Sequence, residues 1–271
     1  MKIQDIKLVI ASILLVFSMS LGAQETITVP LSNPSKPGVL KMNILNGSIK
    51  IVGTSKKEIV VTGTRRESSR RKYKNPKGKE GMKRITSNLL QFSATESDNE
   101  VRVRSSSSGT TDFEIEVPQN FSLKLSTTNR GEIYVENVNG SMDVSNTNGP
   151  ITLKDISGSV SADALNKDIK VSFVKVTADE PMAFSSLNGD IDITFPENFK
   201  ANVKMKTERG EIYTDFDIQT KPRKANVTKD SDAKGNAYRV KLEEWITGSI
   251  NGGGAEILFK NYNGDVIIRS R

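Results

Sequence analysis

The highest concentration of charge in the chain is a basic segment from residue 65 to residue 84. It holds ten Lys or Arg residues against Glu67 and Glu80. The whole chain has a net charge of +7, so this surplus of eight leaves the remainder at −1. Such a segment could capture an acidic glycan, a lipid headgroup or an acidic envelope protein, or it could be a solvated loop. The candidate anion-binding residues are Arg65, Arg66, Arg70, Arg71, Lys72, Lys74, Lys77, Lys79, Lys83 and Arg84.

Acidic residues follow a series of turn glycines. The four that could contribute to a cation site are Glu132, Asp168, Asp190 and Glu211. Stacked carboxylates repel one another by Coulomb's law, so they must be solvated and paired with lysines or bind a hard cation such as Ca²⁺. The solvated arrangement is the favoured interpretation, and the sequence predicts no metal and no other cofactor.

The chain has no His and no Cys. This composition excludes a Ser-His-Asp triad, a Cys-His pair and a zinc site built from His and Cys. Asp190 and Asp192 are available carboxylates, but they lie two residues apart on one predicted strand, about 7 Å from each other like ordinary outward residues. We therefore expect a non-enzymatic protein, with a carbohydrate-active β-helix enzyme as the alternative.

The elements that must position these residues are short repeated strands. Glycines recur every nine residues from Gly131 to Gly158, each followed by apolar residues spaced two apart. This period indicates strands with one buried face, and Asn-Gly pairs indicate turns in which glycine has a positive φ. The match improves at a shift of 18 residues, because Ile133 then aligns with Ile151 and Val135 with Leu153.

Weaker copies extend the repeat. Asn166, Asn188 and Arg209 begin further units, and Asn263-Gly264 marks a turn of the same type. Such self-similarity is typical of a stacked array in which no unit buries its apolar face alone. We predict a single-domain, all-β, β-solenoid or β-helix-like stack with coils of 18–22 residues. An antiparallel β-sandwich is the alternative.

The register of the coils also predicts ladders along the stack. The residue before each turn glycine is often asparagine, as in Asn148, Asn166, Asn188 and Asn263. An asparagine at this position can hydrogen-bond to its equivalent in the next coil. Two polar stretches, residues 65–87 and 217–237, are predicted as loops, the first of them an insertion into the repeat.

The N-terminus predicts a secretory signal. Lys2 and Lys7 form a basic region before an apolar run over residues 8–21, which is too short to span a bilayer comfortably. Cleavage after Ala23 would give a signal peptide of residues 1–23 and a β-strand-repeat domain of residues 24–271. An uncleaved anchor is the alternative. No second apolar run follows, so the mature chain is expected to lack a transmembrane segment.

The repeat resembles a known family. The run Val117-Pro118-Gln119-Asn120-Phe121 and the Asn-Gly-x-Ile-x-Val units look like the putative-adhesin β-strand-repeat family, a domain of unknown function in bacterial envelope proteins. The resemblance is strong over residues 113–216. It implies a β-helix-like fold and an exported location, and it carries over no catalytic residue.

These observations predict an exported protein of the periplasm or of the cell envelope or surface. Its expected role is that of an adhesin-like or structural binding scaffold that engages an anionic partner through the basic segment. A regulatory partner that senses the envelope is a further alternative. Nucleic acid is not expected, because the protein is exported and Tyr73 is the only aromatic residue among the charges.

Overall fold

The computed structural model describes residues 24–66, 90–105, 109–221, 225–229, 238–242 and 245–271. The predicted signal peptide and all of the basic segment except Arg65 and Arg66 lie outside these ranges. The described residues form strands and turns, and none of them forms a helix that could span a membrane.

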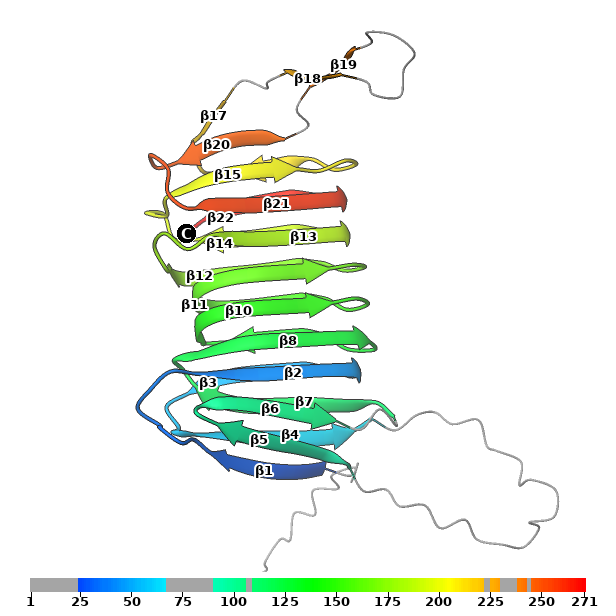
Figure 1. The fold of residues 1–271 in the computed structure, drawn as a ribbon, viewed down its shortest axis with the longest axis vertical. Helices are drawn as coiled ribbons and strands as arrows, with labels where there is room; N and C mark the ends of the chain where they lie inside the picture. The colour runs from blue at the N-terminus through cyan, green and yellow to red at the C-terminus, as the bar shows by residue number, and fades with distance from the viewer. Residues whose placement is uncertain (1–23, 67–89, 106–108, 222–224, 230–237, 243–244) are drawn as a thin grey trace, which may run out of the picture.

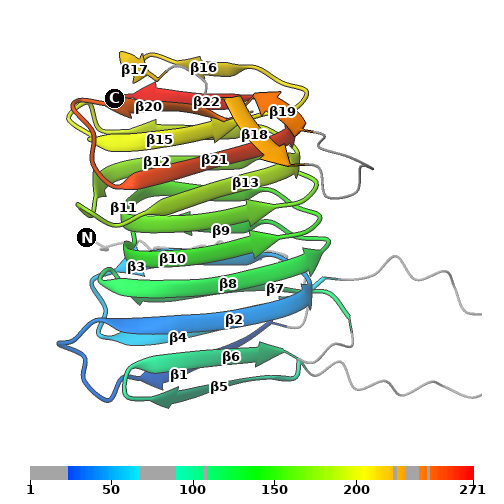
Figure 2. The ribbon, with the colours of Figure 1, turned by 45° about the horizontal axis from the view of Figure 1, so that its top comes forward.

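Twenty strands form one sheet that winds into two facing layers (Figures 1 and 2). We call the layers the front sheet and the back sheet, and strand β11 passes from the back sheet into the front sheet. In spatial order, the front sheet contains β5 (Phe92–Ser97), β6 (Glu100–Ser105), β2 (Gly38–Asn46), β8 (Phe121–Asn129), β10 (Asn139–Asn146), β11 (Ile151–Ala164), β13 (Met182–Asn188), β21 (Glu256–Asn263), β15 (Ala201–Lys206), β20 (Ile246–Ile250) and β17 (Ile218–Thr220).

The back sheet follows the same axis. Its strands in spatial order are β1 (Gln24–Pro30), β4 (Glu58–Arg65), β7 (Thr111–Pro118), β3 (Ile49–Thr54), β9 (Ile133–Glu136), the start of β11, β12 (Ile169–Val176), β14 (Ile191–Phe195), β22 (Val266–Ser270) and β16 (Ile212–Thr214). A separate pair is formed by β18 (Ala225–Lys229) and β19 (Tyr238–Leu242).

The predicted 18-residue register is confirmed. Ile151 pairs in parallel with Ile133 on one side and with Ile169 on the other, and Leu153 pairs with Val135 in the same way. Each coil therefore places its apolar residues directly above those of the coil before it, about 4.8 Å away. The central stack is a parallel β-solenoid.

The core lies between the two sheets. Alternate side chains of each strand point inward, so that the Ile, Val, Leu and Phe residues of the coils form one continuous apolar column. Aromatic residues stack within this column: the ring centroids of Phe173 and Phe195 lie 5.1 Å apart, and those of Phe184 and Phe259 lie 5.4 Å apart. No coil could bury these faces alone, because each is covered by its neighbours.

The spatial order of the coils differs from their order in the sequence. The coil formed by β2 and β3 lies between the β6–β7 coil and the β8–β9 coil. The last coil, β21 and β22, lies between the β13–β14 coil and the β15–β16 coil. Two positions in the stack are therefore occupied by coils that are not adjacent in the sequence to both of their neighbours in space.

The sequence predicts a positive φ at the turn glycines, and the structure shows this conformation at only some of them. Gly131 and Gly149 do not have a positive φ, whereas Gly158 and Gly264 do. A Cβ on Gly149 would lie 1.8 Å from the carbonyl oxygen of Gly131. Glycine is therefore needed at the first two positions because the backbones of successive coils approach closely, and at Gly158 and Gly264 because of this close approach together with the left-handed backbone.

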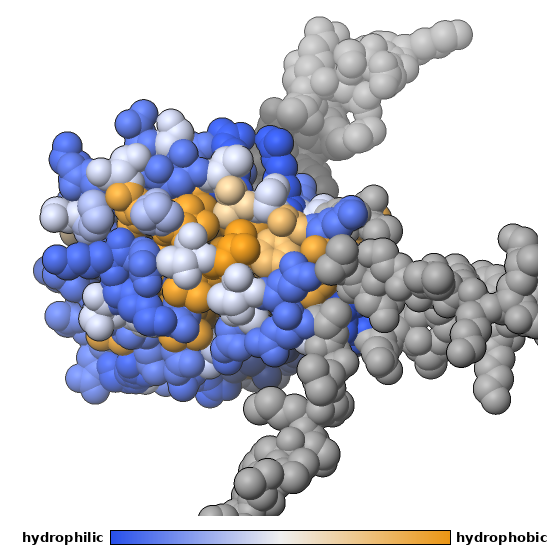
Figure 3. Space-filling model, turned by 90° about the horizontal axis from the view of Figure 1, so that it is seen from below, coloured by the Kyte–Doolittle hydropathy of each residue, from blue (hydrophilic) through white to orange (hydrophobic). Residues whose placement is uncertain are grey.

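Both ends of the solenoid carry antiparallel strands. At the N-terminal end, β1 pairs with β4 and β5 pairs with β6, and at the other end β20 pairs with β15 and β17. Figure 3 looks onto the N-terminal end and shows apolar residues gathered at its centre within a hydrophilic rim. The predicted sandwich alternative is wrong for the central stack, since its strands are parallel.

The two predicted loops need correction where residues are described. Arg65 is the last residue of β4, so the first predicted loop begins one residue too early. The stretch 217–237 contains β17 and β18 and is not simply a loop. β17 is three residues long, and only Ile218 packs on the core, so its alternation is too short to recognise in a sequence.

Candidate functional site

The edge where the front strands turn into the back strands carries an asparagine ladder. Asn148 Nδ2 donates to Asn129 Oδ1 at 2.8 Å, and Asn166 Nδ2 donates to Asn148 Oδ1 at 2.8 Å. The ladder continues from Asn188 to Asn166 at 3.0 Å and from Asn263 to Asn188 at 2.8 Å. The predicted ladder is confirmed for Asn148, Asn166, Asn188 and Asn263, and it extends to Asn129.

The acidic residues on this edge form a second ladder. The Oδ1 atom of Asp168 accepts the backbone N–H of Asp190 at 3.1 Å, and that of Asp190 accepts the N–H of Asp265 at 2.9 Å. Asp265 Oδ1 in turn accepts the N–H of Glu211 at 2.9 Å. Each aspartate oxygen is therefore bonded to the backbone of the next coil, an arrangement that neither of the two predicted alternatives described.

Glu132 and Asp192 do not belong to the aspartate ladder. The backbone N–H of Glu132 bonds to Ser48 Oγ at 3.3 Å, and the coil with Pro150 separates this bond from the aspartate ladder. Asp192 forms an ion pair with Arg269, with 2.8 Å between Oδ1 and Nε. Within the described ranges no three His, Cys, Asp or Glu side chains are grouped to hold a metal ion.

Arg66 anchors the start of the basic segment to this edge. Its Nη2 lies 2.6 Å from Asp112 Oδ1, and its Nε donates to Asp112 Oδ2 at 2.9 Å. Its Nη1 donates to the carbonyl oxygen of Arg130 at 2.6 Å. Arg66 is thus engaged in the fold, and Arg65 forms interactions of its own at the end of β4. The other eight candidate residues lie outside the described ranges.

The front sheet carries basic side chains on three neighbouring strands. Lys41 of β2 pairs in register with Arg102 of β6 on one side and with Lys124 of β8 on the other. Like charges opposite one another on adjacent strands repel. Glu100 offsets part of this repulsion, with 2.7 Å to Lys41 Nζ and 2.5 Å to Arg102 Nη2, and Asp143 lies 3.0 Å from Lys124 Nζ.

Arg104 extends this group along β6. Together, Lys41, Arg102, Arg104 and Lys124 form what we call the basic row, and all four line an open groove of about 510 Å³. The hydrogen bond from Lys41, and then that from Arg102, holds the pKa of Glu100 below its ordinary value. One carboxylate is therefore shared between two cations.

The back sheet provides a contrast, because its ion pairs match one cation to one carboxylate. The hydrogen bond that Lys50 donates to Glu114 is the main cause that raises the pKa of Lys50, and the bond that Lys154 donates to Glu136 raises the pKa of Lys154 in the same way. The pairs are Lys50–Glu114 at 2.6 Å, Lys154–Glu136 at 2.7 Å and Arg269–Asp192 at 2.8 Å. The basic row differs from these pairs because one carboxylate, that of Glu100, is shared between cations on adjacent strands.

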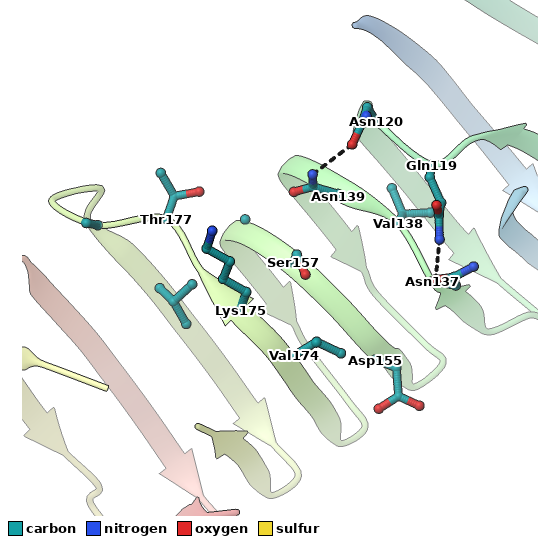
Figure 4. Close-up of a pocket in the computed structure, with 13 residues that line it drawn as sticks. Gln119, Asn120, Asn137, Val138, Asn139, Asp155, Ser157, Val174, Lys175 and Thr177 are labelled. Carbon is teal, nitrogen blue, oxygen red and sulfur yellow. Dashed lines mark hydrogen bonds between the residues drawn. The ribbon is translucent and has the colours of Figure 1, made fainter. Parts of the chain in front are cut away.

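The opposite edge, where back strands turn into front strands, holds a groove of about 600 Å³ (Figure 4). Amide side chains from two successive turns lie along it. Gln119 Nε2 donates to Asn137 Oδ1 at 2.7 Å, and Asn139 Nδ2 donates to Asn120 Oδ1 at 2.8 Å. We call this edge the groove edge.

Sequence reasoning did not identify the basic row or the groove. Lys41 and Arg102 meet only because the β2–β3 coil is inserted between later coils, and no local pattern records that insertion. A signal for the groove was present, since the spacing from Asn148 to Asn166 is 18 residues and that from Asn166 to Asn188 is 22. The additional residues of the longer coil must form a connection that departs from the regular coil.

Comparison with known proteins identifies relatives of this fold. The family model described as Toastrack DUF4097 matches residues 12–244 and confirms the resemblance inferred from the repeats. No curated protein matches the chain.

Two solved structures are similar to the chain. One is a putative cell adhesion protein from Clostridium sporogenes, with 10% identity and a TM-score of 0.44, in a match that covers 93% of this chain and 100% of that one. The other is a putative adhesin from Bacteroides fragilis, with 12% identity and a TM-score of 0.38, which covers 92% of this chain and 97% of that one.

Proposed function

The chain belongs to the Toastrack DUF4097 family, and from this premise we propose that it is an exported, non-enzymatic envelope protein that binds an anionic partner. Its binding surface comprises the basic row on the front sheet and the basic segment, residues 65–84. The partner is an acidic glycan, an anionic lipid headgroup or an acidic envelope protein.

The observation that carries this proposal is the register of the basic row. Lys41, Arg102 and Lys124 lie side by side on adjacent strands, about 4.8 Å apart in the direction of the backbone hydrogen bonds. Like charges at this spacing are unfavourable for folding alone, and only Glu100 and Asp143 offset them within the row. A polyanion would supply the missing negative charge.

The position of the basic segment supports the same surface. Arg66 binds the turn at Arg130, and β5, which follows the segment, pairs with β6 of the basic row. Ser93 of β5 pairs with Arg104 itself. The described residues on either side of the segment are therefore fixed to coils that carry or adjoin the row.

Salt-dependent retention tests this proposal. The purified chain is loaded on immobilised heparin and, separately, mixed with vesicles that contain phosphatidylglycerol. We expect the double substitution Arg102→Gln/Arg104→Gln to lower the salt concentration needed for elution. Neutralisation of Arg70, Arg71, Lys72 and Lys74 is expected to do the same while leaving thermal unfolding unchanged, and the vesicle arm distinguishes a lipid from a glycan.

A matched control removes the same charge elsewhere. Lys57→Gln/Lys170→Gln deletes two exposed lysines outside the basic row, so elution from heparin should change much less. If both basic-site variants elute at the salt concentration of the unmodified chain, the proposed anionic partner is wrong.

A further inference from the structure

The groove edge arises where one coil is longer than its neighbours. The coil between Asn166 and Asn188 has 22 residues, against 18 in the coil before it. Its extra length lies after β12, which ends at Val176, and before β13, which begins at Met182. This connection stands between two hollows, one of about 600 Å³ and one of about 630 Å³, and residues 174–178 line both.

The first hollow presents amide groups that are held in place by one another. Asn137 Nδ2 donates to the carbonyl oxygen of Gly53 at 2.9 Å, and Asn137 Oδ1 accepts from Gln119. Asn139 donates to Asn120. Amides fixed in this way lose little further conformational freedom when a ligand binds.

The same amides keep hydrogen-bonding capacity. The Oε1 atom of Gln119, the Nδ2 atom of Asn120 and the Oδ1 atom of Asn139 have no partner among the residues that the structure describes. An amide offers both donors and acceptors, as does a sugar hydroxyl. Figure 4 shows these side chains along the wall of the hollow, with Ser157 beyond them.

Apolar contact is available between the polar groups. Val174 lines the hollow and is 54% exposed, the most exposed large apolar residue in the described ranges, whereas Val138 in the same lining is buried. Small apolar surfaces beside amides suit the alternating C–H and O–H faces of a pyranose ring.

The charge in the hollow is set by two residues. Lys175 pairs in register with Ser157, and its side chain extends along the same wall (Figure 4). Asp155 also lines the hollow, but its Oδ1 accepts a hydrogen bond from Arg271 Nη1 at 3.0 Å. Because Arg271 offsets Asp155, Lys175 gives the hollow a positive end.

We propose that this hollow is an oligosaccharide-binding site, in which Asn120, Asn139 and Gln119 bind sugar hydroxyls and Lys175 binds a sugar carboxylate. The site is open, so it takes a segment of a longer chain, and the second hollow continues it past residue 178. It uses none of the residues of the basic row and stands or falls independently of the anionic-partner proposal.

Titration of the full chain with trigalacturonate and with its methyl-esterified form tests this site. Calorimetry gives the two affinities, and ¹H–¹⁵N spectra follow the side-chain amides of Asn120 and Asn139. We expect both amides to shift and the free acid to bind more tightly. Asn139→Ala should weaken both ligands by about threefold to tenfold, the range for one lost hydrogen bond. Lys175→Gln should bring the two affinities together.

The control is Asn188→Ala, which removes an exposed amide of the asparagine ladder on the other edge. It should leave both affinities unchanged. The proposal is overturned if neither saccharide shifts the two amides at millimolar concentration, or if Asn188→Ala weakens binding as much as Asn139→Ala.

Discussion

Asn263 donates a hydrogen bond to Asn188 across 2.8 Å, although 75 residues separate them in the chain. This contact marks the place where the last coil enters the stack. Without this last coil, β13 and β15 would each present an unpaired edge, and the aromatic column would be interrupted at Phe259. The final 16 residues therefore fill an inner position of the stack, between two coils that precede them in the sequence.

Phe259→Ala should destabilise the whole protein. The ring is fully buried and stacks on Phe184, so its removal leaves a cavity between two coils. We expect a loss of about 3–5 kcal/mol in the free energy of unfolding, measured by urea denaturation. Lys260→Ala, at the exposed next position of the same strand, should change this value by less than about 0.5 kcal/mol. Equal effects would contradict the inserted position of this coil.

Asn146→Ala tests the buried amide inside a turn. Asn146 Nδ2 donates to the carbonyl oxygens of Gly131 and Pro150, and its Oδ1 accepts the N–H of Gly149. The substitution leaves the N–H of the buried Gly149 without its partner, at a cost of about 1–3 kcal/mol, while the carbonyl of Pro150 keeps its bond from the N–H of Ile133. Asn148→Ala removes an exposed member of the asparagine ladder and should cost less by thermal unfolding. A larger effect at Asn148 would show that the ladder, and not the turn, limits stability.

The sequence predicted the parts of this fold that depend on local periodicity. The alignment of Ile133 with Ile151 and the ladder from Asn148 to Asn188 follow from residues 18–22 apart, which successive coils bring together. The insertion of β21 between β13 and β15 was not predictable in this way. Asn263-Gly264 marks a turn of the same type, but the position of a coil in the stack depends on edges more than 50 residues away.

The same distinction separates the candidate sites. The basic segment can be recognised from the amino-acid composition alone, whereas the basic row can be recognised only when the register between β2 and β6 is known. Local similarity can indicate that a segment forms a coil, but the neighbours of that coil are set by long-range packing of whole apolar faces.

Gly149→Ala and Gly252→Ala separate the two reasons for glycine in this fold. A Cβ on Gly149 would overlap the backbone of the preceding coil, whereas a Cβ on Gly252 would meet nothing within 4 Å. Gly252 instead has a φ of 88°, which costs an L-residue about 1–2 kcal/mol. We expect Gly149→Ala to lower the unfolding midpoint in urea clearly more than Gly252→Ala. The reverse order would argue against close approach of the coils at this turn.

Glu100→Gln should strengthen anion binding by the basic row. The carboxylate neutralises part of the charge of Lys41 and Arg102, and the glutamine keeps its size without its charge. The variant should elute from heparin at a higher salt concentration at neutral pH. Glu114→Gln, which breaks an ion pair on the back sheet, is the matched control and should have a smaller effect. Elution of Glu100→Gln at or below the salt concentration of the unmodified chain would exclude the basic row as the heparin-binding surface.

The pH dependence of that binding follows from the lowered pKa of Glu100. Hydrogen bonds from Lys41 and then Arg102 favour the ionised carboxylate, so it stays charged in the folded chain below the ordinary glutamate pKa. The stability that this ionisation contributes is present above the unfolded-state pKa and is lost as pH falls through the lowered one. Over the same interval the row loses its shared negative charge, and retention on heparin, whose sulfates remain ionised, should rise. In Glu100→Gln this contribution is absent, so a rise of equal size in the variant would assign the effect to other groups.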